Sequence, residues 1–298
     1  MRTFSLIMNF NVGWLIVISI LTAVCSCAIF KTSPYRSING HRVHYQTEGN
    51  GPIMVLAHGG YLDLEIWKPQ MRAFKDDYTL LRFSDLGHGQ SQTRGDSAIF
   101  GYQIIHALAA PYADSSLTLV GLSWGAMLCV DYALRYPERV RRLVLVSPGL
   151  DGWAYFQDSL ARRNYELRAA ATQRNNRTEA ARLFHKNWVV GPRRNSDALS
   201  PDFYHKSLAM IERNMQEHWQ QSWSALSTPP AIERLGELHM PVDLVIGAHD
   251  AEDILMIAEV YHQAIPHARL WQMDDAAHLL TWERAEKFNT LLREILAD

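Results

Sequence analysis

The chain has 298 residues, of which 48% are hydrophobic and 20% are charged, a composition typical of a globular protein with a sizeable core. Its formal net charge is −2 and it contains no long basic run, which argues against nucleic acid as a partner. Three cysteines are too few to suggest a disulfide framework.

Residues 1–30 form a segment of their own. Arg2 precedes an apolar run over residues 12–24, which is typical of an export signal. The sequence around Cys27 resembles a bacterial lipobox, and a small residue before it makes Cys27 a better lipid acceptor than Cys25. A cleaved signal without lipid and an uncleaved anchor are the alternatives, since residues 12–30 could span a bilayer if tilted. Each alternative predicts an exported protein that is membrane-tethered through its N-terminus, periplasmic or secreted.

Residues 31–150 are expected to form the first part of an α/β core, because apolar β-favouring runs alternate with helical patterns at short spacing. An Asn-Gly pair at residues 39–40 predicts a hairpin. Strands are expected over residues 53–57, 78–83, 117–122 and 140–146. Helices are expected over residues 65–74, 98–108 and 124–135.

The pattern changes after residue 150. Residues 151–228 contain no convincing strand, and we interpret them as a helical cap inserted into the sheet domain. Its helices are expected around residues 159–172, 178–188 and 204–226. Residues 229–298 return to the core pattern, with strands over 242–246 and 269–273 and helices over 254–265 and 285–296. The predicted fold class is therefore α/β, a mostly parallel sheet flanked by helices, with an inserted cap.

The sequence Gly121-Leu122-Ser123-Trp124-Gly125 lies between a predicted strand and a predicted helix. A strand that turns at once into a helix strains its middle residue, and flanking glycines remove side chains that would collide. The G-x-S-x-G pattern in this setting is typical of a nucleophile elbow, although the pattern alone also occurs by chance. Ser123 is therefore the candidate nucleophile.

A serine hydroxyl needs a base to remove its proton and an acid to orient that base. Asp250 and His278 follow the last two predicted strands, so they are expected to meet Ser123 at the carboxyl edge of the sheet. We favour Asp250 over Asp253, which could instead cap the following helix. The three candidate catalytic residues are Ser123, Asp250 and His278.

An oxyanion hole needs two N–H donors. The Trp124 N–H, at a helix N-terminus, is one candidate, and the N–H of Gly60 or Tyr61 in the glycine-containing loop after residue 57 is the other. We predict that the substrate pocket is lined by Trp67, Trp153, Trp188 and Trp282. Most cap aromatics are expected to pack cap helices together, but a few could roof the pocket: Trp153, Tyr155, Phe156, Trp188, Phe203, Tyr204, Trp219 and Trp223.

No metal-ligand spacing and no phosphate-binding glycine loop occurs in the sequence, so no metal or cofactor is expected. The partner implied by the site is a small-molecule substrate.

Together these motifs resemble the α/β-hydrolase superfamily, and more narrowly its lid-bearing members of the 3-oxoadipate enol-lactonase and meta-cleavage-product hydrolase type. The resemblance covers residues 37–297. It is carried by His58-Gly59-Gly60, Gly87-His88-Gly89-Gln90-Ser91, the segment around Ser123, residues 229–235, Gly247-Ala248-His249-Asp250 and Ala277-His278-Leu279. In this superfamily the catalytic residues follow the order Ser, Asp or Glu, His along the chain, as here.

The resemblance implies a serine hydrolase that cleaves a small, partly apolar carboxylic ester or lactone through an acyl-enzyme. Hydrolysis of a carbon–carbon bond of the meta-cleavage type, or a catalytically silent membrane-tethered binding protein, are the alternatives. The sequence departs from the family pattern at Ser84, where an Asp is usual and Asp85 comes one step later, and at Leu86, which replaces an Arg or Pro. Trp124 replaces a smaller residue after the serine.

Overall fold

A computed structural model describes residues 33–94 and 98–297 of the chain. The predicted signal or anchor segment, with the candidate lipid acceptor Cys27, lies outside the described residues. Within the described ranges, no helix is long and apolar enough to cross a membrane.

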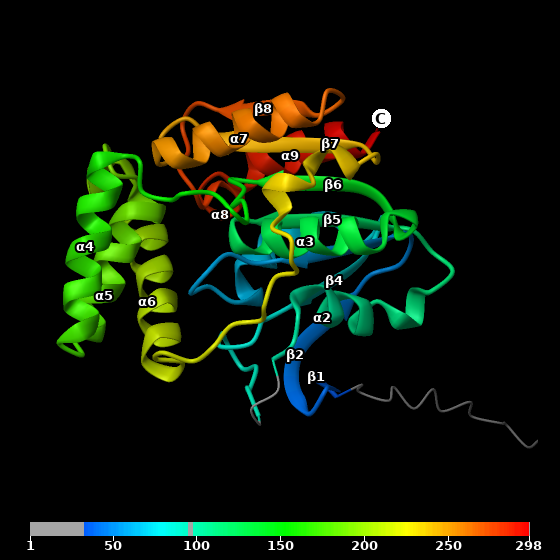
Figure 1. The fold of residues 1–298 in the computed structure, drawn as a ribbon, viewed down its shortest axis with the longest axis horizontal. Coiled ribbons are helices and arrows are strands. Elements are labelled where there is room, and N and C mark those ends of the chain that lie inside the picture. Colours follow the sequence, from blue (N-terminus) through cyan, green and yellow to red (C-terminus); the bar gives the residue numbers. More distant parts are fainter. Residues whose placement is uncertain (1–32, 95–97, 298) are drawn as a thin grey trace, which may run out of the picture. The chain divides into compact units, whose positions relative to one another are not determined.

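Eight strands of the described chain form one sheet in the order β1-β2-β4-β3-β5-β6-β7-β8 (Figure 1). The strands are β1 (Tyr35–Ile38), β2 (His41–Glu48), β3 (Ile53–Ala57), β4 (Thr79–Phe83), β5 (Leu117–Leu122), β6 (Val140–Val146), β7 (Val242–Gly247) and β8 (Arg269–Met273). β1 and β2 form the predicted hairpin, and β2 also pairs antiparallel with β4. The other neighbours pair in parallel, so the predicted mostly parallel sheet is confirmed.

Successive residues of a strand point to opposite sides of the sheet, and in the buried strands both sets are apolar. Helices therefore cover both faces of the sheet. Val55 and Leu119 contribute to one apolar core, and their neighbours Met54 and Val120 contribute to the other. The first core includes α2 (Gly101–Leu108), α3 (Trp124–Arg135) and α7 (Glu252–Ala264). The second includes α1 (Lys68–Phe74), α8 (Leu280–Glu283) and α9 (Ala285–Ala297).

Three helices between β6 and β7 form the predicted cap: α4 (Ser159–Gln173), α5 (Arg177–His185) and α6 (Pro201–Glu217). Figure 1 shows them grouped together beyond one end of the strands. Each begins where a polar side chain caps it, since Asp158, Asn176 and Ser200 accept hydrogen bonds from first-turn N–H groups.

The prediction that the third cap helix continues to residue 226 is wrong. α6 ends at Glu217, and Gln220 takes a φ of 56° that ends the helical path. The His218 ring lies 2.7 Å from the Gly89 carbonyl oxygen, which anchors the returning chain to the core. The sequence predicts a single helix over residues 65–74. The structure instead has a 3-10 turn (Leu64–Trp67) followed by α1, which begins at Lys68.

Two glycines let β5 and α3 pack closely around Ser123. A Cβ at Gly125 would lie 2.1 Å from the carbonyl oxygen of Ala57, and a Cβ at Gly121 would lie 2.5 Å from the carbonyl oxygen of Gly125. Both neighbours are backbone atoms, which cannot rotate away as a side chain can. The expected steric reason for the glycines that flank Ser123 is therefore confirmed.

His185 is buried between α5 and α6. Its Nε2 lies 2.8 Å from Ser207 Oγ, whose single proton is donated to the Phe203 carbonyl oxygen at 2.7 Å. The serine must accept from His185, so Nε2 carries a proton. Burial lowers the pKa of His185 from its ordinary 6.5 to about 4.

We predict that Gly125→Ala lowers the free energy of unfolding by about 1–3 kcal/mol, because the added methyl overlaps the Ala57 carbonyl. Urea denaturation followed by circular dichroism measures the change. Gly236→Ala is the matched control, since a Cβ there meets nothing within 4 Å, and it should shift stability by less than about 0.5 kcal/mol. Equal stability of the two variants would contradict this account of the turn.

We predict that His185 makes the protein less stable as the pH falls from 6.5 to 4. In this window the unfolded chain binds a proton at this position and the folded chain does not, so acidification favours unfolding by up to about 3 kcal/mol. His185→Gln keeps an N–H donor for Ser207 but cannot titrate. As the pH is lowered from 7 to 4.5, the free energy of unfolding of His185→Gln minus that of the parent chain should therefore increase, as measured by urea denaturation. A difference that does not change with pH would refute the prediction.

Candidate active site

Ser123 occupies the sharp turn between β5 and α3 with φ 53° and ψ −109°. Positive φ at a residue with a side chain is strained and persists only where the surroundings fix it. Here the Ser123 N–H donates to the Val146 carbonyl at 2.9 Å, and the Ser123 carbonyl accepts from Ala126 and Gly149 at 3.0 and 3.2 Å. These bonds hold the predicted nucleophile at the end of its strand.

His278 and Asp250 form a buried pair in the loops after β8 and β7. His278 Nδ1 lies 2.8 Å from Asp250 Oδ2 and 3.1 Å from Oδ1. The Ala251 N–H donates to Asp250 Oδ1 at 2.8 Å, which fixes the carboxylate. Because the carboxylate accepts the proton on Nδ1, Nε2 of the neutral ring is left as the basic nitrogen.

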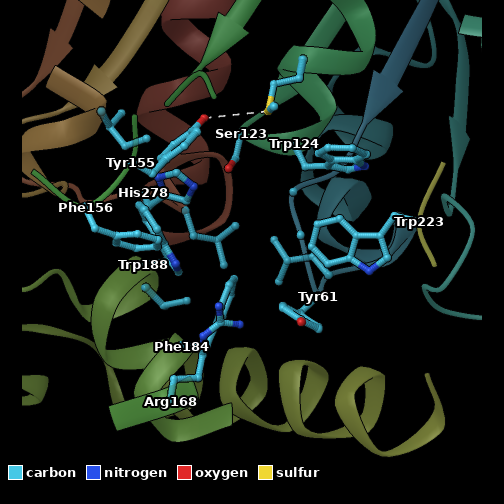
Figure 2. A pocket seen from close by; sticks show the side chains of 17 residues that line it. Tyr61, Ser123, Trp124, Tyr155, Phe156, Arg168, Phe184, Trp188, Trp223 and His278 are labelled. Atoms are coloured by element: carbon cyan, nitrogen blue, oxygen red, sulfur yellow. Dashed lines mark hydrogen bonds between the residues drawn. The ribbon is translucent and has the colours of Figure 1, made fainter. Parts of the chain in front are cut away.

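Ser123 and His278 line the same pocket, and Figure 2 shows them beside each other on one wall. The Ser123 hydroxyl has no hydrogen-bond partner among the residues that the structure describes. Serine–histidine bonds are often long in the free state and tighten when substrate binds. The structure thus brings the three predicted catalytic residues to one edge of the sheet.

The candidate oxyanion donors belong to residues that line the same pocket as Ser123. Trp124 is the first residue of α3, and Tyr61, in the loop after β3, has a φ of 55°. In the described ranges, no acceptor pairs with the main-chain N–H of either residue, so both can serve an anion. Gly60 lets Trp223 pack against the loop, since a Cβ there would lie 2.8 Å from the Trp223 ring.

Asp253 does not cap α7, as the alternative interpretation of this residue expected; the helix N-cap is Ala251. Its carboxylate instead accepts from the Trp153 indole at 3.2 Å and from the N–H groups of Gln157 and Asp158, each at 3.1 Å. Asp253 therefore holds the segment that leads into the cap.

The pocket above Ser123 has a volume of about 280 Å³ and 17 lining residues (Figure 2). Its walls are mostly apolar and aromatic, and they come from the core and from the cap. Of the four tryptophans predicted to line it, Trp188 does, with its ring centroid 4.9 Å from that of His278. The other aromatic lining residues are Tyr61, Trp124, Tyr155, Phe156, Phe184 and Trp223.

The prediction that Trp67, Trp153 and Trp282 line the pocket is wrong. Trp67 is fully buried in the second core beneath the sheet. Trp153 packs on the first core and donates its indole N–H to Asp253. Trp282, on α8, stacks edge-to-face on Phe203 of the cap, with ring centroids 5.6 Å apart. In each case the packing of neighbouring elements turns the ring away from the cavity.

Sequence reasoning missed Arg168 and Phe184, which line the pocket from α4 and α5. Neither stands in a motif, and each lies in a polar helical stretch whose inner face depends on how the cap packs. Tyr155, Phe156 and Trp223 were among the cap aromatics whose orientation the sequence left open.

Asp85 links the two main departures from the family pattern. Its Oδ2 accepts from the Trp124 indole at 2.8 Å and from Ser224 Oγ at 2.9 Å. Its N–H donates to His58 Nε2 at 2.9 Å, while His58 Nδ1 lies 2.7 Å from the Gly59 carbonyl. Burial raises the pKa of Asp85, and the two donated bonds oppose that rise. Asp85 thus links Trp124, the residue after Ser123, to His58, the residue before the candidate oxyanion loop, through hydrogen bonds.

Within the described part of the chain, no group of three or more His, Cys, Asp or Glu side chains is arranged to hold a metal ion.

Residues 52–285 match the family model described as alpha/beta hydrolase fold. Carboxylesterase YbfK of Bacillus subtilis is 25% identical over 280 residues, which are 86% of this chain and 84% of that protein. Cis-3-alkyl-4-alkyloxetan-2-one decarboxylase of Shewanella oneidensis is 31% identical over 122 residues, 39% of this chain and 38% of that protein. The enol-lactonase structure from Burkholderia xenovorans LB400 is similar in fold, with a TM-score of 0.71 at 22% identity, and the match covers 89% of this chain and 100% of that one.

We predict that Asp250→Asn lowers kcat for 4-nitrophenyl acetate by roughly 1,000- to 10,000-fold while leaving the unfolding temperature nearly unchanged, because the amide stabilises the wrong His278 tautomer. Asp253→Asn is the matched control. It should lower stability by about 1–3 kcal/mol, since an amide N–H would face main-chain N–H groups, and change kcat less than about tenfold. A large loss of kcat in Asp253→Asn together with a small loss in Asp250→Asn would instead assign to Asp253 the carboxylate that orients His278.

Proposed function

The chain belongs to the alpha/beta hydrolase fold family, and on that premise we propose that it is a serine hydrolase that cleaves a small, partly apolar carboxylic ester or lactone. The single observation that carries the proposal is the buried Asp250–His278 pair beside a serine held at positive φ. The carboxylesterase and the enol-lactonase among the similar proteins support the choice of ester and lactone bonds.

In the proposed reaction, His278 Nε2 takes the proton of the Ser123 hydroxyl as its oxygen attacks the substrate carbonyl carbon. Asp250 stabilises the imidazolium that forms. The N–H groups of Trp124 and of Gly60 or Tyr61 stabilise the negative charge on the former carbonyl oxygen. The protonated His278 then gives its proton to the leaving alkoxide, and an acyl-enzyme on Ser123 remains.

Water completes the cycle. His278 removes a proton from a water molecule, whose oxygen attacks the acyl carbon; collapse of the second tetrahedral intermediate returns the proton to Ser123 and releases the acid. In a lactone the alcohol and the acid belong to one molecule, so the product is a single hydroxy acid. The aromatic walls and the volume of about 280 Å³ suit a small substrate with an apolar portion.

We predict that a fluorophosphonate adds once to the purified full-length chain, at Ser123, as read by intact mass and peptide mapping. The adduct should be absent in Ser123→Ala and strongly reduced in His278→Ala, because only a deprotonated serine attacks phosphorus at a useful rate. Ser123→Ala should retain the parent unfolding temperature and lose ester turnover by several orders of magnitude.

The same protein distinguishes the alternatives. A folded chain that forms no adduct would favour the catalytically silent binding protein. An adduct together with faster turnover of a phenolic meta-cleavage product than of simple esters would favour carbon–carbon bond hydrolysis.

A further inference from the structure

Arg168 is the only Arg, Lys, Asp or Glu among the 17 residues that line the pocket in the described chain. It lies on α4 and is half-buried. A pocket with one permanent positive charge, no acidic lining residue and mostly apolar walls has an electrostatic preference for a ligand that brings a negative charge near Arg168.

Aromatic rings surround the Arg168 guanidinium. Its central carbon lies 5.2 Å from the ring centroid of Tyr165, 5.8 Å from that of Phe184 and 5.9 Å from that of Tyr61. The faces of aromatic rings attract a cation, but they do not accept the N–H groups that point outward in the guanidinium plane. The rings therefore favour the presence of the charge in the pocket without satisfying its hydrogen-bond donors.

Three other arginines of the cap have acidic partners. Arg193 pairs with Asp158 at 2.5 Å, Arg194 with Glu283 at 2.8 Å and Arg213 with Asp63 at 2.6 Å. Across residues 33–94 and 98–297, by contrast, the Arg168 guanidinium forms no salt bridge and donates no hydrogen bond, and the contacts that the structure records for it are with aromatic rings. The planar guanidinium can form two parallel hydrogen bonds to a carboxylate or phosphate, and in Arg168 its donors are available for a ligand.

Figure 2 shows Arg168 across the pocket from Ser123, with aromatic side chains between them. A substrate whose ester or lactone carbonyl lies at Ser123 would extend along those rings toward Arg168. We propose that Arg168 binds a terminal oxyanion, a carboxylate or a phosphate, at the end of the substrate remote from the bond that is cleaved. This assignment rests on the proposed function and narrows it to acidic esters or lactones.

The test uses phenyl monoesters of unbranched dicarboxylic acids with four to ten carbons, and their phenyl methyl diesters as neutral partners. The full-length protein should show a higher kcat/KM for release of phenol from the acid than from the diester at one chain length, where the carboxylate reaches Arg168. Phenyl esters of ω-phosphonooxy acids of the same lengths distinguish a carboxylate from a phosphate. The anion that Arg168 prefers should give the larger ratio of kcat/KM for the charged ester to kcat/KM for the neutral diester.

Arg168→Met should lower kcat/KM for the preferred acid by roughly 10- to 100-fold and leave that of the diester within about threefold, because only a charge-assisted pair is lost. Arg168→Lys should have a kcat/KM for the acid between those of the parent and Arg168→Met. Lysine keeps the positive charge but cannot form the two parallel hydrogen bonds of the guanidinium. Arg163→Met is the matched control. Arg163 is an exposed arginine on the same helix outside the pocket lining, so its replacement should leave kcat/KM unchanged for both the acid and the diester. Equal losses for acid and diester in Arg168→Met would reduce Arg168 to a structural role and overturn the proposal.

Binding separates this proposal from the proposed function. If Ser123 is not labelled by fluorophosphonate and no ester is cleaved, titration calorimetry of the same phenyl monoesters against Ser123→Ala still measures the anion site. Binding that weakens roughly 10- to 100-fold in Ser123→Ala combined with Arg168→Met supports the site without the reaction. Binding of acid and diester with equal affinity, or of neither, overturns it.

Discussion

The close approach of β3, β5 and α3 at Ser123 is the constraint on which the rest of the site depends. Gly125 brings the start of α3 against the carbonyl of Ala57, the last residue of β3, and the loop that follows then passes beside the serine. A Cβ at Gly59 would lie 3.4 Å from the Ser123 Cβ. The turn at Ser123 and the candidate oxyanion loop are therefore packed against each other at positions where only glycine fits without displacing its neighbours.

The loop between β4 and α2 shows how a departure from a family pattern can be compensated locally. With Ser84 in place of the usual Asp, its hydroxyl accepts from the Leu64 N–H at 3.3 Å and its carbonyl accepts from Ser91 Oγ at 2.6 Å. The carboxylate one step later, on Asp85, reaches the Trp124 indole. A tryptophan after the nucleophile is itself unusual, and that carboxylate accepts the hydrogen bond of its partly buried indole N–H. The two departures thus form one interaction.

The sheet and the catalytic residues could be predicted because their signals are local. β3, β5, β6 and β8 begin and end at the predicted residues, since each is a short β-favouring run bounded by turn residues. Ser123, Asp250 and His278 follow strand ends, and parallel pairing then brings them to one edge. The pocket walls could not be predicted in this way. Whether Trp153 or Phe184 faces the cavity depends on how three amphipathic helices pack on the core, and the inner face of α4 carries an arginine that no periodicity distinguishes from a solvent-exposed one.

The cap and the catalytic histidine are joined through one carboxylate. Glu283, on α8, accepts hydrogen bonds from the two terminal nitrogens of Arg194 of the cap, at 2.8 and 3.1 Å. Its Oε2 also accepts from the N–H of Ala277, the residue before His278. Both ion-pair partners are largely removed from water, so the geometry of the pair is narrowly defined and loss of either partner would strand a buried charge. The position of the cap thereby constrains the loop that carries His278. Arg213, on α6, also pairs with Asp63 of the core at 2.6 Å, so two cap arginines join the cap to the core, whereas Arg168 lines the pocket.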